Sequence, residues 1–273
     1  MRLQNKVIII TGSTAGIGSA MARLFVHEGA QVMLHGLEKE AGDALLAELG
    51  SAAALHLDDL VDPDAAPRLT RATLKRFGKI DALVNNAAVT QRRVLADTDA
   101  EFFDRLIAVN LRAPLLLIRA AMKSLAVTEG VVLNIGSVLA HCGQANLLAY
   151  SISKGGLMTL TRNLADALGP QRIRVNQLNV GWTLTHNEYE VKLADGLPPN
   201  WPERLPTSIV PSGRILSPED VARGALYWVS DESRPISGTV ADFEQYPVIG
   251  RVPNQEKHNH GCTTEQFNGK YQS

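Results

Sequence analysis

Cysteine is scarce in this chain, with only Cys142 and Cys262 among 273 residues. Disulfide frameworks and zinc ligand sets need several cysteines at short spacings, so the count argues against both. We expect two free thiols in a reducing compartment. No run of about 20 apolar residues is present to span a bilayer, and the first apolar run is too short for a secretory signal peptide. These absences predict a cytoplasmic protein.

An excess of charge of one sign is also missing, because 27 Lys and Arg against 28 Asp and Glu leave a formal net charge of -1. Such a chain has no strong field for nucleic acid or an anionic membrane, so we expect neither as a partner. Apolar residues make up 45% of the chain, as in ordinary globular proteins. Internal repeats and linkers are absent, so we assign residues 1–250 to one domain. The polar tail 251–273 is expected either to dock on a partner subunit or to stay mobile.

Short apolar runs rich in β-branched residues recur along the chain and are typical of buried strands. We predict strands at 7–11, 30–35, 53–57, 82–84, 131–135, 173–178 and 239–243. Helical patterns lie between them, among others at 63–77 with Pro63 at its start, at 99–127 and at 150–168. This alternation indicates βαβ units, right-handed crossovers and a parallel sheet covered on both faces. The predicted fold class is therefore α/β.

The first strand leads into a glycine-rich turn, Thr11–Gly18, which a helical pattern follows. Strand, turn and helix in this order are the context that a dinucleotide site requires. Gly12 permits a tight turn, and Gly16 and Gly18 let the backbone approach a pyrophosphate at the helix N-terminus. The spacing G-x-x-x-G-x-G differs from the G-x-G-x-x-G fingerprint. The turn therefore predicts a dinucleotide cofactor only together with its flanking strand and helix.

The end of the second strand distinguishes the two nicotinamide cofactors, since an acid there binds the ribose 2′-hydroxyl of NAD and an Arg accepts the 2′-phosphate of NADP. This chain has His35, Gly36 and Leu37, which are neither. Glu38 lies nearby, but at the start of the next helix an acid suits the helix dipole. The turn 12–18 contains no Lys or Arg. The missing positive charge favours NAD.

A predicted strand delivers Ser137 at its carboxyl end, and Tyr150 and Lys154 follow. On a helix, Tyr150 and Lys154 are i,i+4 neighbours on one face. A free tyrosine has a pKa of about 10, and a nearby ammonium stabilises the phenolate and lowers that pKa. Ser137 would then hydrogen-bond the substrate oxygen that Tyr150 protonates or deprotonates. The pattern predicts an acid/base tyrosine, although a surface pair has the same spacing.

Residues 181–212 break the alternation of strands and helices, with several prolines and with Trp182 and Trp201. A segment of this length without periodicity is either a lid or poorly ordered. It follows the carboxyl end of a strand, where open α/β sheets bind ligands. We therefore interpret it as the substrate loop, the alternative being an insertion without a role.

In combination, these motifs are similar to those of the short-chain dehydrogenases/reductases, and the resemblance runs from Lys6 to Phe243. It rests on the turn Thr11–Gly18, on N-N-A-A from Asn85, on Asn110 and Ser137, and on Y-S-I-S-K from Tyr150. It implies a Rossmann-like, doubly wound parallel sheet of about seven strands with helices on both faces. The chain departs from the family pattern in having Ala88 where a glycine is common and Val180 where a proline is common.

The resemblance also implies a catalytic tetrad of Asn110, Ser137, Tyr150 and Lys154. In it, Tyr150 is the acid/base, Ser137 polarises the carbonyl, and Lys154 lowers the Tyr150 pKa and holds the nicotinamide ribose. Asn110 would kink its helix and hold a water that relays protons to Lys154. The further residues implied to contact the cofactor are Gly12, Ser13, Thr14, Gly16, Ile17, Gly18, Gly36, Leu37, Asp59 and Leu60 beside the adenine, Asn86, Gly181, and Thr183 near the nicotinamide amide.

These roles predict an enzyme that transfers a hydride between NAD(H) and a small hydroxylated or carbonyl substrate, without a metal. Polar residues near the site favour a sugar, a polyol or another secondary alcohol. His141 and Asn146 either line that site or satisfy loop backbone, and Arg92 and Arg93 either meet an acid or stay solvated. The residues predicted to contact substrate are Ser137, Gln144, Tyr150 and Trp182.

Two alternatives stay open at this point. An NADPH-dependent 3-oxoacyl or ketone reductase on the same fold would need a basic group near Gly36. A non-catalytic nucleotide-binding protein would usually lose part of the tetrad, which this chain retains. The resemblance further implies a homotetramer or homodimer packed through the helices that carry Asn110 and Tyr150, helped by the small residues Gly155 and Gly156.

Overall fold

Seven parallel strands form one sheet in a computed structural model that describes residues 1–249. The order across the sheet is β3-β2-β1-β4-β5-β6-β7. The strands are β1 (Val7–Ile10), β2 (Gln31–Gly36), β3 (Ala53–Leu57), β4 (Ala82–Asn85), β5 (Val131–Ser137), β6 (Arg174–Val180) and β7 (Val240–Phe243). The predicted tail 251–273 and Cys262 lie outside the described residues, and the assignment of one domain to 1–250 stays a prediction.

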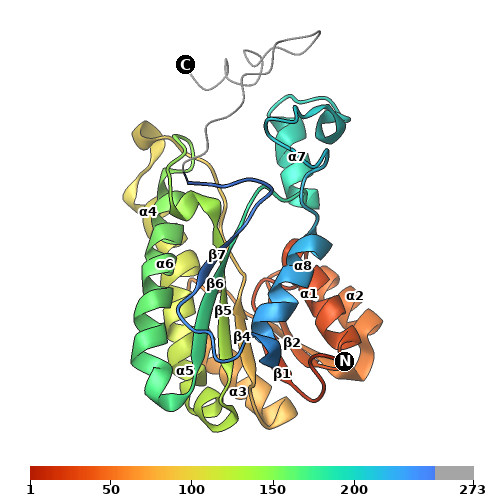
Figure 1. The fold of residues 1–273 in the computed structure, drawn as a ribbon, viewed down its shortest axis with the longest axis vertical. Coiled ribbons are helices and arrows are strands. Elements are labelled where there is room, and N and C mark those ends of the chain that lie inside the picture. The colour runs from red at the N-terminus through yellow and green to blue at the C-terminus, as the bar shows by residue number, and fades with distance from the viewer. Residues whose placement is uncertain (250–273) are drawn as a thin grey trace.

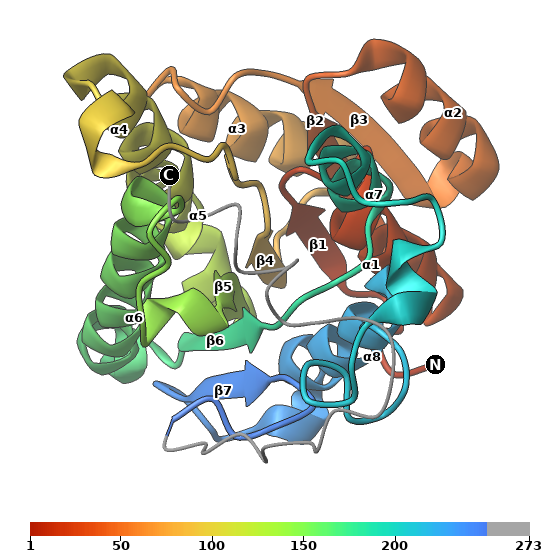
Figure 2. The same cartoon turned by 90° about the horizontal axis from the view of Figure 1, so that it is seen from above.

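Helices cover both faces of the sheet (Figures 1 and 2). One face carries α1 (Gly16–His27), α2 (Lys39–Leu49) and α8 (Pro218–Val229). The other carries α3 (Ala65–Phe77), α5 (Ala113–Thr128) and α6 (Leu148–Leu168), and the remaining helices are α4 (Ala100–Ile107) and α7 (His186–Ala194). The Rossmann-like, doubly wound fold expected from the sequence is confirmed. Within residues 1–249, no helix is long and apolar enough to cross a bilayer.

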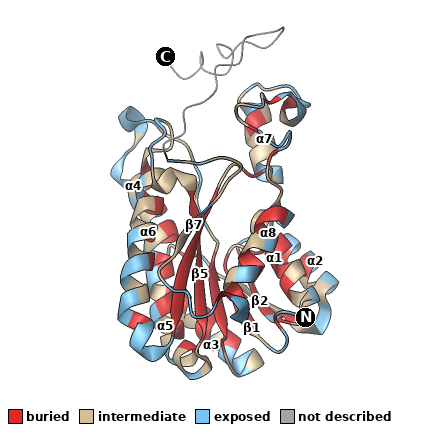
Figure 3. Ribbon diagram, viewed as in Figure 1, coloured by how far each residue is buried: buried red, intermediate tan, exposed pale blue. Residues whose placement is uncertain are grey.

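The central strands are apolar along their whole length because helices cover both of their faces. In β1, Ile8 and Ile10 pack into the core under α1 and α8, whereas Ile9 packs into the core under α3 and α5. This division follows from the two-residue period of a strand. Figure 3 shows the resulting buried sheet between half-exposed helices. The central sheet is therefore a rigid base for the side chains at its carboxyl edge.

Two predicted helices differ from the observed ones at their ends or inside. The helix predicted from Pro63 begins at Ala65, with Asp64 as its N-cap. The long helix predicted at 99–127 is divided, because a π-helical turn, Ala108–Arg112, separates α4 from α5 and contains Asn110. Turns of this kind occur mostly at functional sites.

The segment after β6 contains regular structure, and its interpretation as the substrate loop stays a prediction. It contains α7 and a 3₁₀-helix, Trp201–Arg204. We call residues 181–216 the cap. The cap has its own small core around Trp201, whose ring stacks on Trp182 with centroids 5.4 Å apart. In Figure 1, α7 stands beyond the carboxyl ends of the strands.

The small residues on α6, Gly155 and Gly156, are both partly exposed, and Gly156 has a close neighbour in the same chain. A Cβ at Gly156 would lie 2.8 Å from Leu111 Cδ2, and the nearest atom to a Cβ at Gly155 is the Ala140 carbonyl oxygen. Gly156 therefore allows α6 to pack closely on the π-helical turn of the same chain. The expected tetramer or dimer stays a prediction.

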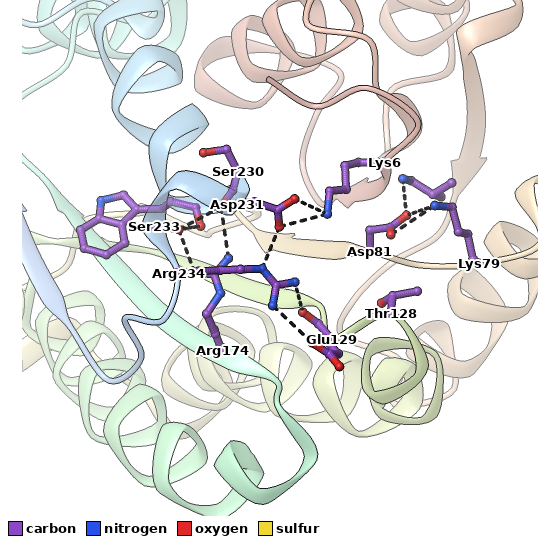
Figure 4. A network of polar contacts seen from close by, with 12 residues as sticks. Lys6, Lys79, Asp81, Thr128, Glu129, Arg174, Ser230, Asp231, Ser233 and Arg234 are labelled. Atoms are coloured by element: carbon purple, nitrogen blue, oxygen red, sulfur yellow. Dashed lines mark hydrogen bonds and ion pairs between the residues drawn. The ribbon is translucent and has the colours of Figure 1, made fainter. Parts of the chain in front are cut away.

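At the amino ends of the strands, charged side chains form a network of ion pairs (Figure 4). Lys6 Nζ lies 3.0 Å from Asp231 Oδ2, and Arg234 Nε donates to Asp231 at 2.9 Å. Arg234 also lies 3.6 Å from Glu129. Asp81 accepts a hydrogen bond from the first backbone N–H of β1 at 2.8 Å. This amino-end network joins β1, β4, α5 and α8 at the edge of the sheet opposite the cap.

Candidate active site at the carboxyl edge of the sheet

The glycine turn after β1 has a backbone conformation and close contacts that residues with side chains could not adopt without strain. Gly12 has φ +61°, and a Cβ there would lie 2.9 Å from Ala87 Cα. A Cβ at Gly18 would collide with the Gly12 carbonyl oxygen. Asn86 Nδ2 donates to two carbonyl oxygens of the turn, at 2.9 and 3.0 Å. Asn86 therefore holds the turn in shape from β4, which is a role that its sequence position alone did not indicate.

The turn presents the start of α1 to the carboxyl edge of the sheet. The N-cap residue, Ala15, makes no side-chain hydrogen bond, so the first backbone N–H groups of α1, including those of Gly16 and Ile17, have no partner within the helix. Such groups form an anion site, and the arrangement fits a pyrophosphate. Ser13 is fully buried, and its hydroxyl accepts from the His35 N–H at 2.9 Å. The Ser13 side chain thus joins the turn to β2.

The Glu38 carboxylate, which the sequence assigned to the start of the next helix, lies just after β2. Glu38 Oε2 accepts from Thr14 Oγ1 at 3.0 Å, and Glu38 makes no capping bond to α2. Thr14 reaches this position because Gly36 has no side chain: a Cβ there would lie 2.5 Å from Thr14 Oγ1. Burial lowers the pKa of His35 to about 4, so His35 adds no positive charge. Leu37 is exposed.

The other predicted cofactor residues border the same edge with different exposure. Asp59 is exposed after β3, whereas the Leu60 side chain is buried in the core under α3 and α5. Gly181 follows β6, and a Cβ there would collide with the Glu244 carboxylate. Thr183 is buried at the base of the cap. The expectation that Asp59 and Leu60 flank the adenine stays a prediction.

Strand β5 and helix α6 bring three of the four tetrad residues together. Ser137 ends β5, hydrogen-bonds the Tyr150 phenol, and accepts from the Leu139 N–H at 3.2 Å. Lys154 Nζ lies 5.6 Å from the centroid of the Tyr150 ring. It donates to the Ile135 carbonyl at 2.8 Å. The Ser137 hydroxyl, the Tyr150 phenol and the Lys154 ammonium thus lie close together at the carboxyl edge of the sheet.

Burial dominates the acid–base properties of this group. Loss of hydration raises the pKa of Tyr150 to about 12; the hydrogen bond with Ser137 opposes the rise and the Glu188 carboxylate adds to it. Burial also lowers the pKa of Lys154 to about 8. The Lys154 ammonium is directed at the Ile135 carbonyl, and the expectation that it lowers the Tyr150 pKa stays a prediction.

Asn110 connects the tetrad to the loop after β4. Its Oδ1 accepts from the Val89 N–H at 2.8 Å, and its Nδ2 donates to the Val89 carbonyl at 3.0 Å. Nδ2 also donates to Ser153 Oγ at 3.1 Å, and Ser153 donates to the Tyr150 carbonyl at 2.7 Å. Asn110 thus fixes the loop against the first turns of α6. The water that it was expected to hold stays a prediction.

The cap is attached to the β4–α4 loop through Arg92. This side chain donates to Asp195 at 2.9 Å and to both oxygens of Glu188 at 3.2 Å. Glu188 also accepts from Trp182 Nε1 at 2.9 Å. The predicted substrate residue Trp182 therefore has its polar atom bound within the cap, by Glu188, which the sequence offered as one of several hydrogen-bonding groups of this segment. Arg92 is neither solvated nor free for an acid; its neighbour Arg93 pairs with Asp99 at 2.9 Å.

The loop between β5 and α6 differs from expectation in its histidine. His141 Nε2 lies 2.9 Å from Asp242 Oδ1, so it neither satisfies loop backbone nor stands free for a substrate. Gln144, predicted to contact substrate, is exposed, and the Oδ1 of Asn146 is buried without a hydrogen-bond partner. In the part of the chain that the structure describes, no cluster of three His, Cys, Asp or Glu side chains is placed to hold a metal.

Comparisons with known proteins agree with the fold. The family model described as enoyl-(acyl carrier protein) reductase matches residues 12–243. The chain is 34% identical to short-chain dehydrogenase reductase 5 of Arabidopsis thaliana, over 87% of this chain and 92% of that protein. It is 32% identical to a sorbitol dehydrogenase of Cereibacter sphaeroides, over 85% and 93%.

A solved structure shows the same similarity at the level of the fold. The 3-ketoacyl-(acyl-carrier-protein) reductase of Brucella melitensis, complexed with NADH, superposes with a TM-score of 0.78 at 31% identity. The match covers 88% of this chain and 97% of that one. The chain belongs to the short-chain dehydrogenase/reductase family of oxidoreductases. The enzyme class expected from the motifs is thus confirmed over the non-catalytic alternative.

Proposed function

We propose that this enzyme transfers a hydride between NAD(H) and a small hydroxylated or carbonyl substrate, of the class of sugars, polyols and secondary alcohols. The meeting of Ser137, Tyr150 and Lys154 at the carboxyl edge supports the reaction type. The Glu38 carboxylate at the end of β2 supports the cofactor, and the cap supports the substrate class. The single observation that carries the choice of NAD is the hydrogen bond from Thr14 to Glu38.

In this proposal, the chain's own residues hold the reactants and move one proton. A bound nicotinamide dinucleotide supplies the hydride chemistry. The turn at Gly12 and the first N–H groups of α1 would hold its pyrophosphate. Ser137 orients the substrate oxygen, and Tyr150 Oη gives that oxygen a proton or takes one from it. Lys154, close to the phenol, makes transfer of this proton easier.

The end of β2 favours a free ribose hydroxyl over a phosphate. A 2′-phosphate placed beside Glu38 would meet a carboxylate, and such like-charge contacts are a recognised means of rejecting a ligand. Lys39, the nearest cation in sequence, is paired with Asp43. His35 is neutral at physiological pH because its pKa is about 4. No positive charge at this place is thus free to bind the phosphate.

The wall of the cap nearest to Tyr150 favours a neutral, hydroxylated substrate. The Glu188 carboxylate is close enough to raise the Tyr150 pKa, and it is held by Arg92 and by the Trp182 indole. A carboxylate accepts hydrogen bonds from hydroxyl groups and repels anions. The similarity to a sorbitol dehydrogenase is consistent with this class.

Titration of the purified protein with NADH and NADPH tests the cofactor. We expect NADH to bind at least about tenfold more tightly, a difference of ~1.4 kcal/mol. Glu38→Arg should reverse or remove the preference. Glu40→Arg is the matched control, because it changes the charge by the same amount on the exposed side of α2. Tighter binding of NADPH by the wild type would contradict the assignment.

Turnover on a substrate panel tests the substrate class. We expect NADH formation with at least one sugar, polyol or secondary alcohol. The remaining candidate is an NADPH-dependent 3-oxoacyl or ketone reductase, which the match to the Brucella melitensis enzyme favours. Turnover of a 3-oxoacyl thioester with NADPH, and of no polyol or sugar, would establish that alternative in place of ours.

A further inference from the structure

Buried polar side chains cross the sheet beneath α6 in one continuous series. Asn85 Nδ2 on β4 donates to Asn134 Oδ1 on β5 at 2.8 Å. Asn134 Nδ2 donates to Thr161 Oγ1 on α6 at 2.9 Å, and the Thr161 hydroxyl lies 2.9 Å from Gln177 Oε1 on β6. Gln177 Nε2 then donates to Asn179 Oδ1 at 2.7 Å. Four elements are thus joined by side chains alone.

The series ends at a carboxylate on the edge strand. Asn179 Nδ2 donates to Asp242 Oδ1 on β7 at 3.0 Å, and His141 Nε2 lies 2.9 Å from the same oxygen. We call this set the buried ladder; its members are the buried side chains of Asn85, Asn134, Thr161, Gln177 and Asn179, together with the exposed Asp242 and the partly buried His141 at its end. The amide donors of the ladder point toward Asp242, so their dipoles align with its negative charge. The Thr161 hydroxyl also lies 2.8 Å from the Leu157 carbonyl oxygen. Aligned, charge-terminated hydrogen bonds strengthen one another.

Placing such a series of polar side chains in a core costs free energy, so we infer that the series has a function beyond packing. Asn134, Gln177 and Asn179 are completely buried, in strands whose other buried residues are mostly apolar. Burying a polar group without partners costs free energy, and an apolar residue would avoid the risk. If these positions served packing alone, valine or leucine would fill them. The ladder instead connects the sheet edge to the loop that carries Ser137.

The ladder touches the Ser137 segment on both sides. Immediately before Ser137, Gly136 lies flat against the amides, since a Cβ there would collide with Asn179 Oδ1 and lie 2.5 Å from Gln177 Nε2. After Ser137, the 3₁₀-turn Val138–Ala140 ends at His141, which Asp242 holds. Within that turn, the Leu139 N–H donates to Ser137 Oγ. The direction of the Ser137 hydroxyl thus depends on two anchored neighbours.

We propose that Asp242 and His141 are positioning residues for Ser137, and that the buried ladder fixes Asp242 for this purpose. The inference rests on the proposed function for the role of Ser137 as the group that orients substrate. Asp242 and His141 contact each other and the turn, and they act on the reaction through the Ser137 hydroxyl.

A double-mutant cycle on turnover separates positioning from folding. Asp242→Asn should lower kcat by roughly tenfold, because small displacements of a catalytic group are costly, with the Kd for NADH unchanged. In a Ser137→Ala background the same change should have no further effect on kcat. Asp81→Asn is the matched control, since Asp81 is a buried carboxylate that joins strands at the opposite end of the sheet; it should lower thermal stability and leave kcat unchanged. Additive losses in the cycle, or an equal loss of kcat in the control, would overturn the proposal.

Two further measurements keep the test independent of the substrate. Asp242→Asn should increase amide hydrogen exchange in residues 136–142 and leave the glycine turn 12–18 protected; unchanged exchange in 136–142 would overturn the proposal. His141→Gln, which keeps a donor toward Asp242, should retain more activity than His141→Ala. If the wild type turns over no substrate with either cofactor, the proposed function fails, and the exchange measurement still decides whether the ladder holds the Ser137 segment.

Discussion

The two ends of the parallel sheet use charged residues in opposite ways. At the amino ends, charges pair with opposite charges near the surface, as Lys6 does with Asp231 and Lys79 does with Asp81, each at 3.0 Å. At the carboxyl ends, Lys154 is buried and donates to a carbonyl, and Tyr150 is hydrogen-bonded by a hydroxyl. Burial moves both pKa values against the charged form.

The difference separates residues that support the fold from residues that support chemistry. Exposed ion pairs contribute about 0–1 kcal/mol each. Buried groups without an opposite charge cost stability, and perturbed pKa values of this kind cluster at active sites. Substitutions at the amino ends of the strands should therefore change mainly stability. Substitutions at the carboxyl ends should change mainly turnover.

The largest expected effect is on turnover in Tyr150→Phe. Loss of the phenol removes the proton carrier, so kcat should fall by at least about a hundredfold, while the affinity for NADH stays unchanged. Steady-state kinetics and cofactor titration measure the two effects. Tyr189→Phe is the matched control, since this phenol donates to the Pro199 carbonyl within the cap; it should keep nearly full activity. Retained turnover in Tyr150→Phe would remove Tyr150 from the mechanism.

Lys154→Met should abolish most activity and yet raise stability near neutral pH. The pKa of Lys154 falls from 10.5 unfolded to about 8 folded. Below pH 8 the folded protein holds a charge that it disfavours, at a cost on the order of 3 kcal/mol. Between pH 8 and 10.5 only the unfolded chain keeps the proton, so the stability of the wild type rises with pH there.

Denaturant unfolding at several pH values tests this sign. The advantage of Lys154→Met over the wild type should be greatest at pH 7 and should shrink toward pH 10. A lower stability of the variant at pH 7, or a difference that does not change with pH, would show that burial does not control the ionisation of Lys154.

A smaller effect is expected where the cap meets the β4–α4 loop. Arg92→Ala removes charged hydrogen bonds to Glu188 and Asp195, each typically worth about 1.5–3 kcal/mol. Freeing α7 should raise the KM for substrate by roughly tenfold and change kcat less. Arg93→Ala, one residue away, removes contacts to Asp97, Asp99 and Phe102 but none to the cap, and it should leave KM nearly unchanged. Equal effects of the two changes would refute the attachment of the cap through Arg92.

The smallest effect belongs to the amino-end network. Lys6→Met should lower the free energy of unfolding by less than about 1 kcal/mol and leave kcat unchanged. Asp231→Asn should cost more than Lys6→Met, because Asp231 also accepts from Arg234, and the double variant should be no less stable than Asp231→Asn. A fall in kcat from either change would contradict the separation between the two ends of the sheet.

Most of the sheet, and the residues Ser137, Tyr150 and Lys154 of the candidate site, could be predicted from the sequence. The strand at Ala53–Leu57 was predicted to the residue, because its apolar run and the turns around it are local features. Ser137, Tyr150 and Lys154 were identified by their spacing along a strand and a helix. Each of these signals depends on residues close together in the chain, which a single sequence displays.

The residues that were missed depend on contacts between distant segments. Glu38 was assigned to the helix dipole because its pairing with Thr14 requires Gly36 to be packed against that threonine. The end of β6 was predicted two residues too early, since the buried amide of Asn179 interrupts an apolar run and its partners come from other strands. Helix α7 was missed because the apolar residues of the cap pack around Trp201 from several turns rather than along one helical face.

The most direct test of the account is the pH dependence of a single turnover of alcohol oxidation in the wild type and in Tyr150→Phe. A Tyr150 pKa of about 12 leaves little phenolate at neutral pH, so the rate of NADH formation in the wild type should rise as the pH rises. The variant should be slow, and its rate should not change with pH. An equal rise with pH in both proteins would show that another group takes the proton, and would contradict the central role of Tyr150.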